Sequence, residues 1–168
     1  MTKPTQKDLH TVSLLVANKP GVLVRIALVF ARRGFNIDSL VVSPTVNPKF
    51  SRMTITAQGS PATLEQIIKQ TSKLIDVVHA GEHTAVDAVS KEMALLKIHC
   101  KASQKSALEK ILQAFHAHVI DKTGYAWIIE QTGSTTELDS LEEELKKFGL
   151  IEMVRTGKLV MVHGNKTT

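Results

Sequence analysis

One order of expected elements occurs twice along the chain, and this repeat constrains the fold more than any other feature. Residues 11–17 alternate apolar and polar side chains like a half-buried strand, and residues 22–33 carry apolar side chains at helical spacing. A strand at 36–43 and another around Met53 follow, and Ser60 and Pro61 then open a second helix. A strand at 77–83 completes the order βαββαβ.

The second half of the chain shows the same order. A strand at 93–99 is followed by a helical stripe of Leu108, Ile111, Leu112 and Phe115. Two strands are then expected, one around residues 119–121 and one at 125–132. The pattern Ser134-x-x-Glu137 predicts a capping box that opens a helix, and Gly149 ends that helix. A strand at 151–154 closes the copy, and residues 159–162 form a further short strand.

A βαββαβ unit folds into a four-stranded antiparallel sheet with two helices on one face, the ferredoxin-like arrangement. The sequence therefore predicts an α+β protein of two consecutive ferredoxin-like βαββαβ domains, at residues 9–84 and 91–164, joined by a linker at 84–91. Each copy is small enough for its core to be marginal, and its sheet edges need cover. We therefore expect at least a homodimer.

The turn between the first strand and the first helix is Asn18-Lys19-Pro20-Gly21-Val22-Leu23. Proline suits the first turn of a helix, and glycine allows another molecule to approach closely. The first amides of a helix lack internal partners and carry partial positive charge, so they bind carboxylates or phosphates. The second copy has residues 101–105, Lys-Ala-Ser-Gln-Lys, at this place and lacks the Pro-Gly turn. The first copy is therefore the expected sensor of a small anion.

Composition limits the classes of function. The formal charge of +5 comes from Lys and Arg spread along the whole chain among acidic residues, without a basic stripe, which argues against nucleic-acid binding. The single cysteine, Cys100, fits a reducing compartment. Neither a membrane-spanning run nor a targeting segment is recognisable, so a cytoplasmic protein without a membrane partner is expected.

Other candidate sites are weaker. His79 and His83 have the spacing of a metal pair on a helix, but they fall in a predicted strand, so no metal site is expected there. Cys100 has no recognisable nucleophile setting, and no glycine pattern matches a phosphate-binding loop. The acidic run Glu142-Glu143-Glu144 is predicted to lie on the solvated face of the last helix. No catalytic residues are therefore expected.

Several motifs resemble a known family. A strand, Asn-x-Pro-Gly-Val-Leu and a helix that ends in Arg-Gly-Phe-Asn-Ile are similar to the ACT domain, which binds amino acids for feedback control. The runs at 33–40 (RGFNIDSL), 51–55 (SRMTI), 73–77 (KLIDV) and 91–98 (KEMALLKI) resemble the regulatory small subunits of acetolactate synthase. The resemblance extends from about His10 to Gly164 and is strongest before Ile98.

The resemblance implies a non-catalytic subunit that activates the catalytic large subunit of acetolactate synthase and confers feedback inhibition in branched-chain amino acid biosynthesis. It implies that the large subunit uses thiamine diphosphate, Mg and FAD, whereas this chain carries no cofactor. It also implies a homodimer through the ACT domains, with valine or a related branched-chain amino acid at the interface. Carried over by motif, the effector-binding residues are Asn18, Pro20, Gly21, Val22, Leu23, Asn36 and Ile37.

The chemistry of these residues suits an amino acid. Amides near Gly21 can bind its carboxylate, the side chains of Asn18 and Asn36 offer acceptors for its ammonium, and Leu23 and Ile37 can enclose an apolar side chain. Gly21 serving only a tight turn, and Asn36 serving only a helix end, are the alternatives. Three functions stay open: a regulatory subunit, a free-standing ACT sensor or transcriptional regulator, and an enzyme in its own right. The residues themselves do not select valine among the branched-chain amino acids.

Overall fold

The structure, a computed structural model, describes residues 9–84 and 86–168 and separates into two compact units. The first unit comprises the described chain up to Ser90 together with Gly157–Thr168, and the second comprises Lys91–Thr156. The sequence placed residues 157–164 in the second domain, whereas the structure groups them with the first unit. Each unit contains one βαββαβ order, so the predicted α+β class with two such units is confirmed.

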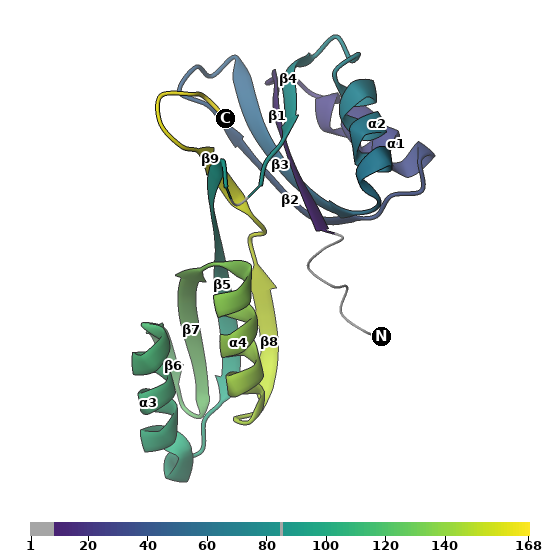
Figure 1. The fold of residues 1–168 in the computed structure, drawn as a ribbon. Helices are drawn as coiled ribbons and strands as arrows, with labels where there is room; N and C mark the ends of the chain where they lie inside the picture. Colours follow the sequence, from purple (N-terminus) through teal and green to yellow (C-terminus); the bar gives the residue numbers. More distant parts are fainter. Residues whose placement is uncertain (1–8, 85) are drawn as a thin grey trace. The chain divides into compact units, whose positions relative to one another are not determined.

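The first unit is an antiparallel sheet with two helices on one face (Figure 1). Its sheet has the strand order β2-β3-β1-β4. Its elements, in chain order, are β1 (Leu9–Ala17), α1 (Val22–Arg32), β2 (Ile37–Pro44), β3 (Phe50–Gln58), α2 (Pro61–Thr71) and β4 (Val77–Glu82). Every second residue of β1 and β3 faces the helices, and Val12, Leu14 and Ile55 there are fully buried. Ile26 and Phe30 of α1 fill the space above them.

Helix α1 is held at its C-terminal end by glycine. The N–H of Phe35 donates to the carbonyl of Phe30 at 3.1 Å, and the N–H of Gly34 donates to that of Ala31 at 3.0 Å. This bond pair, with φ of 71° at Gly34, is the Schellman arrangement that ends a helix. The ring of Phe35 then lies so close to Gly59 that a Cβ there would be 2.5 Å from it. Asn36 is thereby fixed at the start of β2.

The opposite face of the first sheet is polar and covered. Ser13, Thr54 and Thr56 point away from the helices, yet they are at most 4% exposed. Gly157 approaches this face, because a Cβ on it would meet the Ser39 Oγ at 2.5 Å. In Figure 1 the C-terminal segment lies on the side of this sheet away from α1 and α2. The C-terminal segment and His83, which bonds to the Ser13 Oγ, therefore both contribute to covering the face that the helices leave open.

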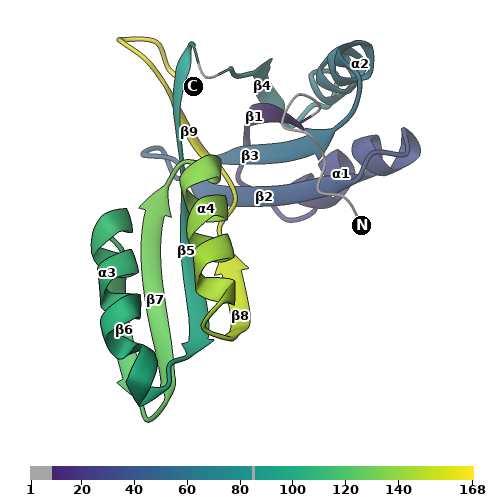
Figure 2. The ribbon, with the colours of Figure 1, turned by 60° about the horizontal axis from the view of Figure 1, so that its bottom comes forward.

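The second unit repeats the architecture. Its strand order is β6-β7-β5-β8. Strand β9 (Leu159–Val162) also pairs with β5 but lies in the segment that belongs to the first unit. The elements of the second unit are β5 (Ala88–His99), the 3-10 turn η2 (Ala102–Gln104), α3 (Lys105–Phe115), β6 (His118–Thr123), β7 (Ala126–Gly133), α4 (Thr135–Lys146) and β8 (Leu150–Arg155). Both α3 and α4 lie on the near side of this sheet in Figure 2. Leu96, Ile98, Trp127 and Ile129 of the sheet pack beneath them.

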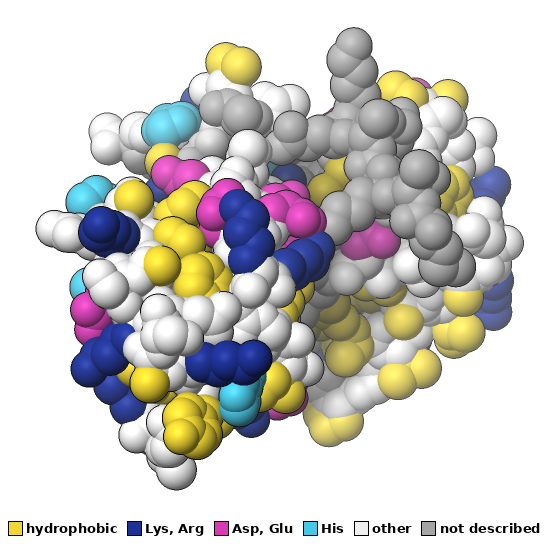
Figure 3. Space-filling model, turned by 90° about the horizontal axis from the view of Figure 1, so that it is seen from below, with side chains coloured by type: hydrophobic (Ala, Val, Ile, Leu, Met, Phe, Trp, Pro, Cys, Tyr) yellow, Lys and Arg dark blue, Asp and Glu magenta, His cyan; other side chains and the backbone are white. Residues whose placement is uncertain are grey.

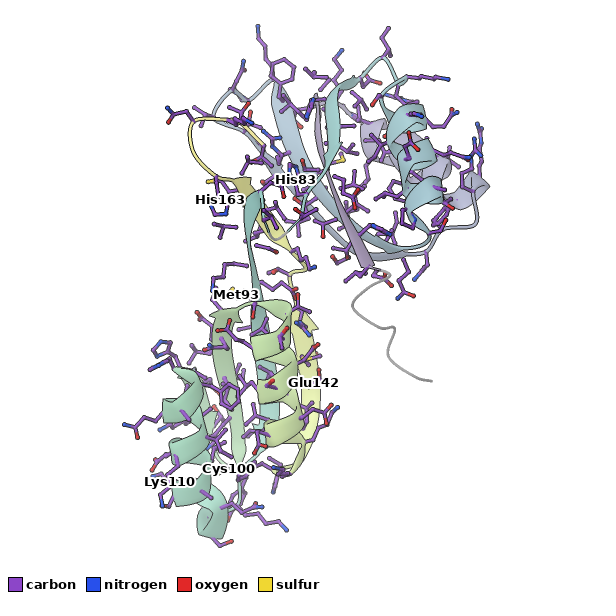
Figure 4. All side chains as sticks on the ribbon, in the orientation of Figure 1. His83, Met93, Cys100, Lys110, Glu142 and His163 are labelled. Atoms are coloured by element: carbon purple, nitrogen blue, oxygen red, sulfur yellow. The ribbon has the colours of Figure 1, made fainter. Side chains whose placement is uncertain are left out.

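Local signals in the second half are confirmed in part. Ser134 and Glu137 form the predicted capping box, because each side chain accepts from the other residue's backbone N–H. Strand β5 begins at Ala88, so part of the predicted linker at 84–91 is strand. Glu142, labelled in Figure 4, is only 7% exposed and pairs with Lys146 at 3.0 Å. The solvated position predicted for Glu142 is therefore wrong.

Candidate effector-binding site

In the turn before α1, Pro20 precedes the N-cap residue Gly21 and therefore lies outside the first helical turn, in which the sequence had suggested it. Gly21 has φ of 82° and ψ of −10°, a left-handed conformation that residues with a side chain rarely adopt. Gly21 is the N-cap residue, and its carbonyl accepts from the N–H of Arg25 at 3.2 Å. The glycine therefore turns the chain from β1 into the helix within one residue.

The first turn of α1 leaves backbone donors open. No side chain caps this helix, and its first turn contains no acidic residue. The N–H of Val22 reaches the carbonyl of Lys19 only at 3.5 Å, and the described residues give no protein partner to the N–H groups of Leu23 and Val24. Unpaired donors at a helix start carry partial positive charge, so this turn can bind an anion.

A guanidinium stands beside these amides. Arg25 lies one helical turn after Gly21, and its Nη1 is 3.2 Å from the position that a Cβ on Gly21 would occupy. Its Nη2 donates to the Oδ2 of Asp76 at 2.5 Å, and the Asp76 side chain is only 12% exposed. The backbone carbonyl of Asp76 also accepts from the N–H of Ala17, at the end of β1. Asp76 therefore fixes Arg25 next to the turn.

Asn18 is committed partly to the fold. Its backbone N–H donates to the carbonyl of Lys49 at 2.8 Å, and its side-chain Nδ2 donates to the carbonyl of Pro48 at 3.0 Å. Both bonds hold the loop between β2 and β3 against the turn. The side-chain oxygen of Asn18 remains an acceptor, so Asn18 can still receive a hydrogen bond from an ammonium group.

The remaining candidates of the turn differ in burial. Pro20 is exposed, and Leu23 is 41% exposed. Val22 is only 2% exposed and belongs to the core, so its side chain is not available to a ligand and only its backbone is. On the same helix Val24 and Leu28 are 61% and 45% exposed. Helix α1 thus presents an apolar outer surface beside the open amides.

Asn36 and Ile37 lie at the other end of α1. The helix has 11 residues, so at 1.5 Å per residue its two ends are about 16 Å apart. Asn36 is exposed there, whereas Ile37 is half-buried and packs against the core. One chain therefore brings Asn18, Pro20, Gly21, Val22 and Leu23 together but does not bring Asn36 to them. An amino acid is much shorter than this helix, so it cannot touch both groups of one chain.

Sequence reasoning missed Arg25 and Asp76. The spacing of Gly21 and Arg25 was a usable signal, because residues four apart share a face of a helix. Asp76 could not be found this way, since it is distant in the sequence and meets Arg25 only through the fold.

The other candidates do not form sites. The described residues contain no group of three or more His, Cys, Asp or Glu placed to hold a metal ion. His83 bonds to the Ser13 Oγ at 2.5 Å, and burial lowers its pKa below the ordinary value. Cys100 is buried near the end of β5, where burial raises its pKa (Figure 4). Such a thiol is a poor nucleophile.

The surface and the helices add two observations. On the face drawn in Figure 3, Lys and Arg side chains are scattered among apolar and acidic ones. None of the helices among residues 9–84 and 86–168 is long and apolar enough to cross a membrane.

Comparison with known proteins connects this turn to a family. Residues 12–79 match the family model described as the AHAS small subunit-like ACT domain. Residues 91–164 match the model described as the small subunit of acetolactate synthase. The two matched ranges together include the Pro-Gly turn, Asn36 and the whole second copy of the βαββαβ order.

Full-length relatives agree. The chain is 41% identical over 155 residues to the acetolactate synthase small subunit of Mycobacterium bovis, which covers 92% of each protein. It is 39% identical over 155 residues to that of Mycobacterium leprae, again over 92% of each. The crystal structure of the Thermotoga maritima small subunit matches with a TM-score of 0.84 at 36% identity, over 94% of this chain and 99% of that one. The chain belongs to the family of acetolactate synthase small, regulatory subunits.

Proposed function

We propose that this chain binds a branched-chain amino acid at the Gly21 turn and thereby regulates the catalytic large subunit of acetolactate synthase. The observation that carries the proposal is the cluster of unpaired amides at the start of α1, with Arg25 beside them and no acidic residue in the first turn. These groups donate the hydrogen bonds and supply the positive charge that bind an amino acid's carboxylate. Each charge-assisted hydrogen bond contributes roughly 1.5–3 kcal/mol.

The effector is proposed to lie between two copies of the chain. Gly21 and Asn36 are at opposite ends of α1, yet both belong to the motifs shared with the family. A two-fold axis beside α1 would bring Gly21 of one copy to Asn36 of the other, because such an interface pairs each patch with its counterpart. The exposed Leu23, Val24 and Leu28 on α1 would then be buried and would enclose the apolar side chain of the effector.

Regulation follows if the effector binds one arrangement of the pair more tightly than another. A coupling of about 1–3 kcal/mol changes the affinity of the other partner roughly 5- to 150-fold. The large subunit supplies the chemistry with thiamine diphosphate, Mg and FAD, as the family implies. This chain is proposed to raise the activity of that enzyme and to make it sensitive to valine, with leucine and isoleucine as competing effectors.

Reconstitution tests the proposal. The large subunit is assayed for pyruvate condensation alone, with this chain, and with this chain plus valine, and valine binding to the isolated chain is measured by calorimetry. We expect activation by the chain, inhibition by valine, and valine binding without the large subunit. A chain that activates the large subunit without binding any branched-chain amino acid would contradict the proposed effector site. One that does not activate would contradict the regulatory role.

A further inference from the structure

The sheet face opposite the helices differs between the two units in its side chains and in its coverage. In the first unit this face is lined with hydroxyls and is closed by the chain itself, as the close approach of Gly157 to Ser39 shows. In the second unit the corresponding face is apolar at its centre. Leu95, Ile128 and Val154 line a hollow of about 200 Å³ there, and Val154 is 58% exposed. The described part of the second unit puts no segment over this hollow.

The strand pairing defines this surface, which we call the open face. Leu95 and Lys97 of β5 alternate with the core residues Leu96 and Ile98, so they point away from the helices. Their cross-strand partners share the same side. The open face comprises Met93, Leu95, Lys97, His99, His118, Asp121, Thr123, Ala126, Ile128, Glu130, Thr132, Glu152 and Val154.

The charge of the open face differs from that of the whole chain. Besides the two imidazoles it carries the carboxylates of Asp121, Glu130 and Glu152 against the single ammonium of Lys97. Lys97 is already paired with Glu152 at 3.0 Å. Glu130 has no ion-pair partner among the residues that the structure describes. The face is therefore acidic, although the chain has a formal charge of +5.

This charge selects among occupants. A second copy of the open face would bring unpaired carboxylates against carboxylates, and like charges facing each other cost free energy. A different protein with an apolar side chain at its centre and Lys or Arg around it would fill the hollow and pair Glu130 and Asp121. Interfaces are built in this way, with an apolar centre and a polar rim.

We infer that the open face of the second unit docks the catalytic large subunit, through an apolar side chain in the hollow and basic side chains at Glu130 and Asp121. This inference rests on the proposed regulatory function and adds the surface through which it acts. It also separates the roles of the two units: the first binds the effector, and the second holds the enzyme.

Two variants on the open face test the inference. Val154→Asp places a charge in the hollow, and Glu130→Lys reverses the rim charge; both side chains are partly exposed, so the fold should survive. The small-subunit concentration that gives half-maximal activation of the large subunit should rise about tenfold or more for Val154→Asp and about three- to tenfold for Glu130→Lys. Added salt should weaken assembly of the wild-type chain more than that of Glu130→Lys.

Matched controls keep the result specific. Glu109→Lys makes the same charge change on the helix side of the second unit, and Val86→Asp replaces a valine of the first unit that is 90% exposed. Neither should change half-maximal activation, and valine binding to isolated chains should be unchanged in all four variants. Circular dichroism checks that each variant is folded.

The outcomes separate the two proposals. Activation by Val154→Asp and Glu130→Lys at wild-type concentrations would overturn the docking surface and leave the regulatory function intact. A change in the oligomeric state of the isolated Val154→Asp chain, with normal activation, would assign the face to self-association and overturn the inference. A wild-type chain that never activates the large subunit would overturn both.

Discussion

At the scale of single residues, Gly21 and Arg25 make the candidate site. Gly21 supplies a left-handed turn. Arg25 supplies positive charge, and its Nη1 lies 3.2 Å from the position that a Cβ on Gly21 would occupy. The sequence predicted Gly21 because a Pro-Gly turn before a helix has a local signature. Arg25 was missed although its spacing from Gly21 was a usable signal, because the contact with Asp76 that fixes its side chain is formed only in the folded chain. Glu142 was misassigned for a similar reason, since a charge run does not reveal which member faces the core.

Gly21→Asp tests the proposed binding position of the effector's carboxylate. The new carboxylate would lie where that of the effector is proposed to bind, next to Arg25 and the open amides. Valine affinity should fall about 100-fold or more, since at least one charge-assisted bond is lost and like charges repel. Activation of the large subunit should persist. Calorimetry with valine measures the first effect and the condensation assay the second.

Gly124→Asp is the matched control for Gly21→Asp. Gly124 also has positive φ, 60°, and a Cβ there would have open space. Gly124→Asp imposes a similar backbone strain in the second unit and leaves the Gly21 turn unchanged. Equal losses of valine affinity in both variants would assign the effect to strain and remove Gly21 from the site.

Arg25→Gln tests whether the guanidinium of Arg25 binds the carboxylate of the effector. Valine affinity should fall about tenfold, the cost of one charge-assisted bond. Valinamide lacks the carboxylate, so its weaker binding should change much less, and the preference for valine over valinamide should shrink. Arg155→Gln, in the second unit where Arg155 pairs with Asp139 at 2.6 Å, should change neither. Parallel losses for both ligands would mean that Arg25 only supports the fold.

At the scale of elements, the strands and helices followed from periodicity, including the short strand β9 (Leu159–Val162), but the packing of the segment after β8 did not. Helix α2 begins at Pro61 after a Ser60 cap, and α4 begins after the Ser134 box, as the sequence predicted. These signals are local, so they can be found in one sequence. The grouping of the C-terminal segment 157–168 with the first unit has no such local signal. The place of this segment depends on a close approach of Gly157 to Ser39 of β2, which only the folded chain creates.

Gly157→Ala tests that approach. A Cβ at Gly157 would lie 2.5 Å from the Ser39 Oγ, so the segment must move off the sheet. Gly164 has a similar φ, 72°, but open space around it. Gly157→Ala and Gly164→Ala should each lower the free energy of unfolding by about 1–2 kcal/mol through left-handed strain. Gly157→Ala should lower it by a further ~1–3 kcal/mol through overpacking. Urea unfolding of the two variants measures the difference. Equal stabilities would mean that the segment does not close this face.

At the scale of the whole molecule, one βαββαβ order occurs twice and gives two sheets. The repeated βαββαβ order was readable because both copies keep the same apolar periodicity. The second unit begins at Lys91, where the predicted second domain begins, whereas the last twelve residues group with the first unit. The proposed division of roles between the two units rests on sequence differences at equivalent places. The Pro-Gly turn occurs in one copy only, and the face opposite the helices is hydroxyl-lined in the first unit but has an apolar centre with acidic residues around it in the second.

The length of α1 makes the shared site the central claim, since a single chain cannot bring Gly21 and Asn36 to one amino acid. Mixing Gly21→Asp chains with Asn36→Ala chains tests it most directly. If each site takes Gly21 from one copy and Asn36 from the other, a mixed dimer keeps one intact site. Equal mixing after unfolding and refolding should then restore about a quarter of the wild-type valine stoichiometry at wild-type affinity, although neither variant binds alone. No recovery of high-affinity binding in the mixture would contradict the shared site.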